Sequence, residues 1–553
     1  ALYEEFKRAR NALDFDDLEA GAQALLRDHP AVRARYAGEF RQVLVDEFQD
    51  TNDAQRAIVY ALAGAEDRAG DGRLFVVGDP KQSIYAFRGA DVSVFGRVHD
   101  DFLAWGGQAL PLTTSFRTHA GLVGAFNQLF ETLLNTGDGR ASRYEVRLDQ
   151  PMAAHRPSEP DRTPLHAQPI TTLVFQTPPD DDRFGGVDAL RRWEAWALAQ
   201  HIHELVRQGV LIWDRGLKHD KVPEEYIPAF ARDRGQGAYR PVDYGDVALL
   251  FQATSSLPLY ESVFKAAGLP YVTLTGRGYY DRQEVWDLLN LIGALHNPAD
   301  DLALAAALRS PLFGLSDEAL LALRRARDPE GGALPLWDAL LADEVPLFPA
   351  GDLPARDFAR DVLRELRDLA GRATIAEVLT RALDLTGFPA ALTGLADGAR
   401  RRGNVEKLLA LARESGRVSL GAFNAYARDL SARELREGEA AVEVEHAVQL
   451  MTVHASKGLE FPVVALVDTS WKSPGRIGTF TLDPELGPAC ALPHEPGEKN
   501  PPESSIWKRV KALAGHREAA ERLRLLYVGA TRAQDYLIVS GVIKKRGGMA
   551  DTW

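Results

Sequence analysis

A short apolar stretch that ends in two carboxylates constrains this chain most. Residues 43–45 read Val-Leu-Val and are followed at once by Asp46 and Glu47. Such a run is typical of a strand inside a parallel sheet, and open α/β sheets bind ligands beyond the carboxyl ends of their strands. Beside a nucleotide, one carboxylate can hold Mg²⁺ and the other can polarise an attacking water. Because Asp-Glu pairs after strands are common, the rest of the chain must decide.

Composition places the chain among ordinary globular proteins. Its 553 residues allow roughly three or four domains of about 150 residues each. No run of 18 apolar residues occurs, so neither a membrane span nor a membrane partner is expected. Cys490 is the only cysteine, which excludes an internal disulfide and fits a reducing, cytoplasmic setting. The net charge of −13 neither indicates nor excludes nucleic acid, because binding depends on where the cations lie.

Strand and helix patterns alternate through most of the chain and predict a parallel α/β layer. Helical patterns occupy 1–36, about 52–63, 186–208, 257–267 and 516–531. Strand patterns occupy 43–46, 74–77, 170–175, 247–251, 271–274, 448–453, 463–468 and 536–539. Residues 136–165 and 212–244, rich in glycine and charge, are predicted to be linkers or surface excursions. Residues 283–445 show only helical patterns, which predicts an all-helical insertion beginning near residue 297.

The segment after the second strand carries another polar group. It begins Gly-Asp-Pro-Lys-Gln at residues 78–82. Asp79 fits a helix cap, and Gln82 would close its capping box. The alternative places Gln82 at a γ-phosphate and exposes Phe87 and Arg88 toward nucleic acid, where a ring stacks a base and an arginine grips a phosphate. A core position for Phe87 remains open at this point.

Two arginines end further stretches of interest. Phe116 and Arg117 close an extended run, where Phe116 can lie against an adenine and Arg117 can pair with phosphate. An ordinary surface arginine is the alternative. Arg532 falls in the last turn of a helix, where a cation is favoured by the helix dipole whatever its function. As an arginine finger, it would stabilise charge on a transferred phosphoryl group.

A turn rich in hydrogen-bond donors joins two strong strands at residues 451–461. At the carboxyl edge of a sheet, His454 and Lys457 would offer donors to phosphate, and Glu460 could accept from a ribose hydroxyl. The alternative is that Lys457 and Glu460 form only a surface ion pair, which contributes little.

Taken in order, these stretches resemble the motifs of superfamily 1 DNA helicases of the UvrD/RecB type. The matching stretches are DEFQDTN at 46–52 (motif II), GDPKQSIYAFRGA at 78–90 (motif III), SFRTH at 115–119 (motif IV), TVHASKGLEFPVV at 452–464 (motif V) and RLLYVGATRA at 524–533 (motif VI). The resemblance runs from about residue 3 to residue 545. The form of motif III is closer to the RecB and AddA branch than to UvrD or Rep.

The resemblance implies an α/β fold with two RecA-like parallel-sheet domains, the first incomplete, and an inserted all-helical domain. The expected division is the C-terminal part of RecA-like domain 1A at 1–110 (with the end of helical 1B at 1–36), the first part of RecA-like domain 2A at 111–297, helical insertion domain 2B at 298–445, and the second part of 2A at 446–553. ATP and Mg²⁺ are expected between the RecA-like domains, with single-stranded DNA running across both.

The resemblance also implies roles for individual residues. Asp46 is expected to coordinate Mg²⁺, and Glu47 to act as catalytic base beside the metal. The residues expected at the γ-phosphate are Gln82, Arg117 and Arg532. Phe116 is expected to stack the adenine and Glu460 to meet the ribose. The residues expected to face DNA are Tyr85, Phe87, Arg88 and His454.

The chain departs from the family pattern in two places. No G-x-x-x-x-G-K-[ST] phosphate loop occurs in the sequence, and Gln252 stands where relatives usually carry arginine. We therefore expect the C-terminal part of a longer helicase, lacking the first half of domain 1A and inactive as an ATPase by itself. The carboxylate–lysine cluster of the nuclease domain that often follows in RecB and AddA is not found, so none is expected within this chain.

The function expected from the resemblance is an ATP-dependent 3′–5′ DNA helicase or translocase of recombination and double-strand break repair. Its partners would be single-stranded DNA, duplex ends and a partner helicase/nuclease subunit. One rival is a non-catalytic DNA-binding subunit or degenerate homologue. Another is an ATPase unrelated to DNA, which would leave Phe87 and His454 without a purpose.

Overall fold

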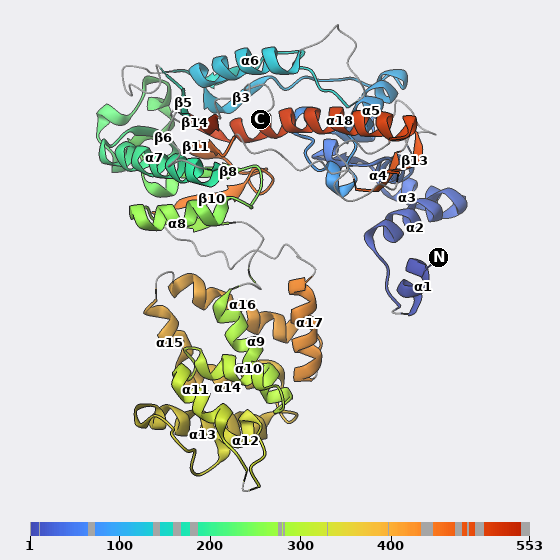
Figure 1. Ribbon diagram of the computed structural model, residues 1–553. Helices are drawn as coiled ribbons and strands as arrows, with labels where there is room; N and C mark the ends of the chain where they lie inside the picture. Colours follow the sequence, from blue (N-terminus) through green and yellow to red (C-terminus); the bar gives the residue numbers. More distant parts are fainter. Residues whose placement is uncertain are drawn as a thin grey trace. The chain divides into compact units, whose positions relative to one another are not determined.

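The computed structural model divides into two compact units, Ala1–Val272 with His446–Trp553, and Thr273–Glu445 (Figure 1). Each unit is considered by itself. The residues that the structure describes are 2–9, 11–64, 72–135, 144–158, 168–176, 186–274, 279, 282–328, 330–395, 398–417, 419–432, 446–469, 478–483, 486–492 and 503–543.

The N-terminal part of the first unit contains a small parallel sheet and five helices. Strands β1 (Val43–Val45) and β2 (Leu74–Val76) pair in parallel. The helices are α1 (Leu2–Ala9), α2 (Phe15–Asp28), α3 (Pro30–Glu39), α4 (Asp53–Ala63) and α5 (Val92–Ala104). Capping boxes at Asp14 and Asn52 begin α2 and α4 and satisfy amide groups that each helix leaves unbonded. Helices α1 to α4 match the helical patterns predicted at 1–36 and about 52–63.

One face of this small sheet differs from the prediction. Val43 and Val45 pack into a cluster around Phe48 and Tyr60. The opposite side bears Leu44, which is 69% exposed. A strand inside a parallel sheet is covered on both faces. Among the described residues, only one face of β1 is covered, so the predicted interior strand is half-buried.

A six-stranded sheet forms the larger part of the first unit. Its order is β5-β14-β11-β8-β10-β9. The strands are β5 (Ile170–Gln176), β8 (Val247–Phe251), β9 (Tyr271–Thr273), β10 (Val448–Thr452), β11 (Phe461–Val467) and β14 (Ala533–Ile543). The pairs β5–β14, β14–β11, β11–β8 and β8–β10 are parallel. The predicted parallel α/β layer is therefore present.

Helices cover both faces of this sheet, which is why β8 is buried along its whole length. Alternate residues of β11 show the two sides. Val463 and Val467 belong to a cluster with α7 (Val187–Arg207) and α8 (Leu257–Ala267). Leu466 faces Gly529 of α18 (Ser505–Ala530), where a Cβ would lie 2.8 Å from the leucine side chain. Helix α18 begins earlier than the predicted 516.

Short paired strands occupy the regions predicted as excursions. Strand β4 (Ala153–Arg156) lies within 136–165 and pairs in parallel with β3 (Thr114–His119), which leads into α6 (Ala120–Leu134). Within 212–244, β6 (Leu211–Lys218) and β7 (Gln236–Pro241) form an antiparallel ribbon. A further pair joins β12 (Phe480–Asp483) to β13 (Gly487–Cys490). The excursion predictions were wrong where these strands form.

The second unit is helical, as predicted. Its helices are α9 (Gln283–His296), α10 (Asp301–Arg309), α11 (Asp317–Arg325), α12 (Leu336–Leu341), α13 (Leu353–Leu369), α14 (Ile375–Thr386), α15 (Phe388–Thr393), α16 (Gly398–Glu414) and α17 (Leu420–Ala432). The unit begins at Thr273, before the expected start at 298, because α9 packs into the helical core with α10 and α17. Among all described helices, none is long and apolar enough to cross a bilayer.

Candidate nucleotide and nucleic-acid site

The carboxylate pair lies where β1 ends and the chain turns sharply. Glu47 has φ 51°, a left-handed conformation, and precedes a 3₁₀ turn at Phe48–Asp50. The Asp46 carboxylate accepts from the Glu47 amide at 2.8 Å. Both Asp46 and Glu47 are exposed. The predicted strand end therefore presents its two carboxylates to solvent.

Gln49 ties this turn to the segment after β2. Its side-chain nitrogen donates to Glu47 at 2.5 Å, and its oxygen accepts from the Asp79 amide at 3.0 Å. Gly78 permits this approach, because a Cβ there would lie 2.5 Å from the Gln49 oxygen. Gln49 is buried, so its side chain has a fixed position from which it orients the Glu47 carboxylate.

Asp79 caps a 3₁₀ turn at Pro80–Gln82, but the predicted capping box is absent. The Gln82 side chain donates to the Asp79 carboxylate at 3.2 Å and does not accept from the Asp79 amide, because that amide already donates to Gln49. Lys81 also pairs with Asp79 at 2.7 Å. The segment is therefore a polar turn beside Glu47 instead of the first turn of a longer helix.

Two of the predicted residues meet at the amino-terminal edge of the six-stranded sheet. Glu460 directly precedes β11 and Arg532 directly precedes β14, and the first residues of these strands are register partners. The turn at 453–460 starts at the carboxyl end of β10 but reaches the amino end of β11. Glu460 therefore lies at the opposite edge from the carboxyl edge predicted for this turn.

Arg117 joins this edge from β3. Its Nε donates to Glu460 at 2.5 Å, and its Nη1 donates to the Thr531 carbonyl at 3.0 Å. Gln534 donates to the other Glu460 oxygen at 3.0 Å. Phe116, the neighbour of Arg117, is 66% exposed, and its ring centroid lies 4.8 Å from that of His155. The sequence motifs around Phe116 and Glu460 thus converge in space.

Arg532 is buried and bonded to protein oxygens. Its guanidinium donates to the carbonyls of Val528 and Leu459 and to the Thr531 hydroxyl. Burial and the neighbouring charge of Arg117 together lower the pKa of Arg532 to about 10, whereas Tyr527, Glu47 and Glu460 oppose the shift. The charge of Glu47 therefore acts on Arg532, although Glu47 follows β1 and Arg532 precedes β14.

Lys457 provides a direct bond between these regions. Its Nζ pairs with Asp50, lies 3.2 Å from Glu47 and donates to the Gln82 carbonyl at 3.1 Å. The Lys457 side chain is only 7% exposed. Burial raises the pKa of Asp50, and the bond from Lys457 opposes that rise. The predicted surface pair between Lys457 and Glu460 was wrong, since each has other partners.

A second buried cation also links the two regions. Arg524 of α18 donates to the carbonyl of Ser83 at 2.6 Å and to that of Tyr144 at 2.9 Å. Burial lowers the pKa of this guanidinium, and Glu521 opposes the shift. Sequence reasoning assigned no role to Arg524, since a cation on a helix rich in charge has no distinguishing pattern. Lys457 lies between Ser456 and Gly458 in a turn rich in hydrogen-bond donors. This position was a sequence signal that Lys457 has a role in the site.

The four residues predicted to face DNA form one cluster. The Phe87 ring lies 5.3 Å from His454 and 5.9 Å from Tyr85, measured between centroids. The Arg88 guanidinium lies 5.1 Å from the centre of the Tyr85 ring, and Lys457 Nζ lies equally close. Phe87 is 38% exposed, which excludes the core position left open by its sequence. His454 donates to the Ile84 carbonyl at 3.1 Å.

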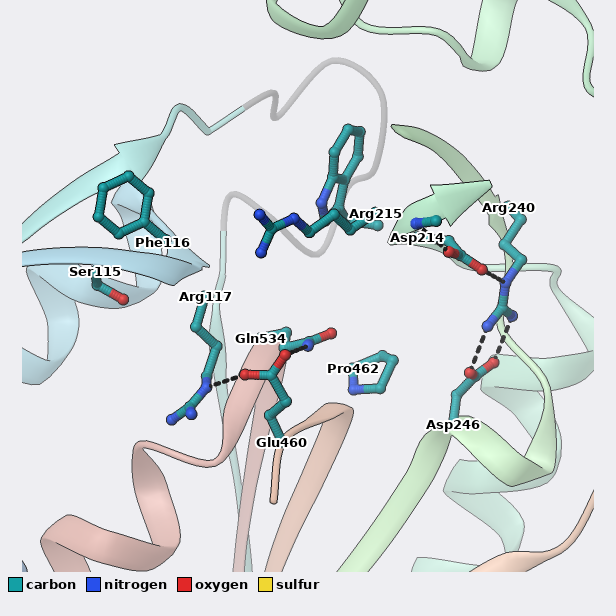
Figure 2. A pocket seen from close by; sticks show the side chains of 12 residues that line it. Ser115, Phe116, Arg117, Asp214, Arg215, Arg240, Asp246, Glu460, Pro462 and Gln534 are labelled. Atoms are coloured by element: carbon teal, nitrogen blue, oxygen red, sulfur yellow. Dashed lines mark hydrogen bonds and ion pairs between the residues drawn. The ribbon is translucent and has the colours of Figure 1, made fainter. Parts of the chain in front are cut away.

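A cavity of about 600 Å³ opens beside Glu460 (Figure 2). The residues that line it are Ser115, Phe116, Arg117, Trp213, Asp214, Arg215, Gly216, Arg240, Asp246, Glu460, Pro462 and Gln534. They come from β3, from the β6–β7 ribbon, from the 3₁₀ turn before β8 and from the amino ends of β11 and β14. The cavity thus contains the residues predicted for the base and ribose, together with a ribbon that the sequence did not predict.

Comparisons with known proteins agree with the motif pattern. Residues 1–103 match the model of the UvrD/REP helicase N-terminal domain, and residues 236–343 and 367–544 match that of the UvrD-like helicase C-terminal domain. An ATP-dependent helicase/nuclease subunit from Listeria monocytogenes serotype 4b (strain F2365) is 29% identical over 99% of this chain and 43% of its own length.

Two further proteins with the same name are similar. The one from Levilactobacillus brevis (strain ATCC 367) is 28% identical over 100% of this chain and 43% of its own length. The one from Bacillus cereus (strain B4264) is 28% identical over 100% of this chain and 44% of its own length. The chain therefore spans less than half the length of the curated relatives it matches.

Proposed function

The chain belongs to the UvrD-like helicases, and on that premise we propose that it forms part of an ATP-dependent DNA helicase or translocase moving 3′ to 5′. The proposed pathway is recombination and double-strand break repair, in the cytoplasm. The relatives are named as helicase/nuclease subunits, which supports a partner subunit. The proposed DNA partners are single-stranded DNA and duplex ends.

The observation that carries this proposal is that Glu47, at the end of β1, lies against the turn that joins β10 to β11 of the six-stranded sheet. Lys457 bonds to Glu47 from the six-stranded sheet, and Glu47 contributes to the field at Arg532. A carboxylate for water and a guanidinium for phosphoryl charge are the groups that ATP hydrolysis requires. They come from segments far apart in sequence and lie in one region.

The residues present fit Mg²⁺. This ion prefers oxygen ligands, retains several waters and is held by one or two carboxylates with substrate phosphates. Asp46 and Glu47 are exposed carboxylates on one turn. Lys457 pairs with one Glu47 oxygen, and the exposed side of each carboxylate faces solvent. Among the described residues no group of three ligands forms a complete metal cage. When bound, Mg²⁺ would neutralise charge on the β- and γ-phosphates.

The protein groups then divide the work of hydrolysis. Glu47 orients the attacking water and accepts its proton, with Gln49 holding the carboxylate in place. Arg117 and Arg532 stabilise the charge that develops on the γ-phosphoryl oxygens, with Gln82 as a neutral contact from the other side. Phe116 stacks the adenine, and Glu460 accepts from the ribose.

The aromatic cluster gives the site its connection to DNA. Phe87, Tyr85 and His454 provide stacking faces for unpaired bases, and Arg88 provides a cation for phosphate. Lys457 touches both this cluster and Glu47. Opening and closing of the nucleotide site would therefore change the DNA contacts, which is the coupling a translocase needs.

The decisive experiment measures DNA-stimulated ATP hydrolysis by the complete gene product. Glu47→Gln and Arg532→Ala should each lower kcat by roughly 10³-fold or more, the scale on which an arginine finger acts. Glu39→Gln and Arg509→Ala, both at exposed positions away from the site, should retain wild-type rates. Absence of turnover in the wild type, with DNA binding retained, would establish the rival function of a non-catalytic DNA-binding subunit.

A further inference from the structure

Strand β3, which carries Arg117, lies outside the six-stranded sheet. Among the described strands, it pairs with β4 alone. Its paired residues are Thr114, Ser115 and His119, and the register shifts between Ser115 and His119. Arg117 lies within this shifted part of the strand. The backbone ladder with β4 therefore does not fix the position of Arg117, and other bonds have to do so.

The start of β14 has carbonyl groups that no neighbouring strand covers. Successive carbonyls of a strand point to opposite edges, and the Arg532 carbonyl accepts from the Phe461 amide of β11 at 3.0 Å. The carbonyls of Ala533 and Asp535 therefore face the edge on which β5 lies. Strand β5 pairs with β14 only from Leu537 onward. The carbonyls of Ala533 and Asp535 thus need donors from elsewhere.

Thr118 and His119 of β3 supply these donors. The Thr118 hydroxyl donates to the Ala533 carbonyl at 2.9 Å, and His119 Nε2 donates to the Asp535 carbonyl at 3.0 Å. Thr118 is 4% exposed and His119 is fully buried. Because a buried carbonyl without a donor is costly, both bonds hold β3 firmly against β14.

The His119 ring is held from its other side as well. His119 is the N-cap of α6, and its Nδ1 accepts from the Leu122 amide at 3.4 Å. Nδ1 also lies 3.1 Å from the Ser158 hydroxyl. Since Nδ1 accepts, the ring proton lies on Nε2, the atom that faces the Asp535 carbonyl. The ring therefore has a single orientation in which it can bond to both helix and strand.

These bonds keep Arg117 beside a second guanidinium. Arg117 Nη1 donates to the carbonyl of Thr531, one residue before Arg532, at 3.0 Å. Burial and then the charge of Arg117 lower the pKa of Arg532, so the two cations repel each other. Glu460 binds Arg117 from the direction of the cavity (Figure 2). Because the two guanidinium groups do not attract each other, the backbone of β3 has to keep Arg117 in place.

We propose that Thr118 and His119 are positioning residues, which hold β3 against β14 and so fix Arg117 relative to Arg532 before a nucleotide binds. This inference rests on the proposed ATP hydrolysis and adds two residues that do not touch the nucleotide. Transition-state stabilisation requires groups that are already in place, and a displacement of about 1 Å can lower a rate by roughly 10²-fold. Loss of either bond should therefore lower kcat and leave KM for ATP nearly unchanged.

The first test compares Thr118→Val with Thr118→Ser in the complete gene product. Valine keeps the shape of the side chain but has no hydroxyl, so kcat for DNA-stimulated ATP hydrolysis should fall roughly 10- to 100-fold. KM for ATP should stay within about threefold. Serine keeps the donor and should retain most of the rate. The matched control, Thr380→Val, removes a hydroxyl that donates to the Ala376 carbonyl in α14 and should change neither quantity.

His119→Asn and His119→Gln separate positioning from folding. Asparagine can still cap α6 but is too short to reach the Asp535 carbonyl, so kcat should fall while Tm stays near that of the wild type. Glutamine can place an N–H near the Nε2 position but is a poor cap, so Tm should fall while more of the rate is kept. Activity that follows Tm, instead of the bond to Asp535, would overturn the role of His119.

A double-mutant cycle shows whether Thr118 acts through Arg117. Thr118→Val should lower kcat in the wild type and have little further effect in an Arg117→Ala background, because the group to be positioned is then missing. The same fractional loss of kcat in both backgrounds would indicate a merely structural role and would overturn the inference.

A transition-state analogue gives a readout that needs no turnover. ADP with a fluorescent label on the ribose is titrated alone and with aluminium fluoride, which mimics the phosphoryl group in transfer. In Thr118→Val the Kd of the fluoride complex should rise by the factor by which kcat falls, and the Kd of ADP alone should not change. An unchanged Kd for the fluoride complex would overturn the inference. If the expected shift occurs in a protein without DNA-stimulated turnover, the inference stands while the helicase proposal fails.

Discussion

Lys457 is the residue on which the two halves of the site depend most. It is buried, and it bonds to Asp50, Glu47 and the Gln82 carbonyl. Replacing it by methionine preserves length and apolar packing but leaves two carboxylates without their cation. Breaking such a pair costs about 3–5 kcal/mol when both charges are buried, and less here because Glu47 is exposed.

We therefore expect Lys457→Met to weaken the coupling between DNA and ATP hydrolysis. The stimulation of kcat by single-stranded DNA should fall by roughly tenfold or more, since about 1.4 kcal/mol of lost contact corresponds to tenfold. The pKa of Asp50, already raised by burial, should rise further without Lys457. The acid limb of the pH–rate profile should consequently move to higher pH.

The matched control is Lys508→Met, which alters an exposed lysine on α18. Both variants are measured by DNA-dependent ATPase rates across a pH series, with the midpoint of thermal unfolding as a check on folding. Full DNA stimulation in Lys457→Met, in a folded protein, would remove Lys457 from the coupling role.

At the residue scale, the sequence motifs predicted which residues lie near one another better than they predicted hydrogen-bond and ion-pair partners. Phe116, Arg117, Glu460 and Arg532 were expected near one another and are. The partners depend on tertiary placement, because Lys457 and Glu460 are three residues apart yet bond to different segments. Local spacing contains no information on which distant carboxylate approaches a given cation.

At the scale of elements, the turn that follows β2 depends on Gly78. A Cβ at this position would lie 2.5 Å from the Gln49 oxygen and 2.8 Å from the Phe95 ring. Gly78→Ala must therefore displace Gln49, which positions Glu47. We expect kcat for ATP to fall at least tenfold and stability to fall by about 1–3 kcal/mol, the usual cost of overpacking.

The control for this change is Gly96→Ala in α5, where a Cβ would meet no atom within 4 Å. That variant should keep its activity and gain stability by roughly 0.5–1 kcal/mol, since alanine favours a helix over glycine. Denaturant midpoints and steady-state ATPase rates check both. A fully active Gly78→Ala would show that Gln49 does not position Glu47.

Regular elements were predictable, and the ribbons between them were not. Strand β8 was evident from its run of apolar residues, because both of its faces are covered. The β6–β7 ribbon contains Trp213, Asp214 and Arg215 in succession and shows no alternation of apolar and polar residues. Its pairing is stabilised by hydrogen bonds from Arg240 to two carboxylates. The charged residues that suggested a surface excursion therefore stabilise a pair of strands.

For the molecule as a whole, the decisive prediction concerns what this chain can do by itself. ATP hydrolysis in this class uses a phosphate loop, whose backbone amides and lysine cradle the β- and γ-phosphates. No G-x-x-x-x-G-K-[ST] stretch occurs among the 553 residues. Arg117 and Arg532 are proposed to contact the γ-phosphate from one side. The phosphate loop that would hold it from the Glu47 side is not in this sequence.

Residues 1–553 alone should therefore hydrolyse ATP no faster than the Glu47→Gln variant of the complete gene product, with or without single-stranded DNA. The same residues should still bind single-stranded DNA through the exposed ring of Phe87, and Phe87→Ala should weaken that binding by roughly 5- to 100-fold, the range for loss of one stacked base. Circular dichroism establishes that both proteins are folded. DNA-dependent turnover by residues 1–553 would contradict the requirement for a phosphate loop and would place all of the catalytic groups within this chain.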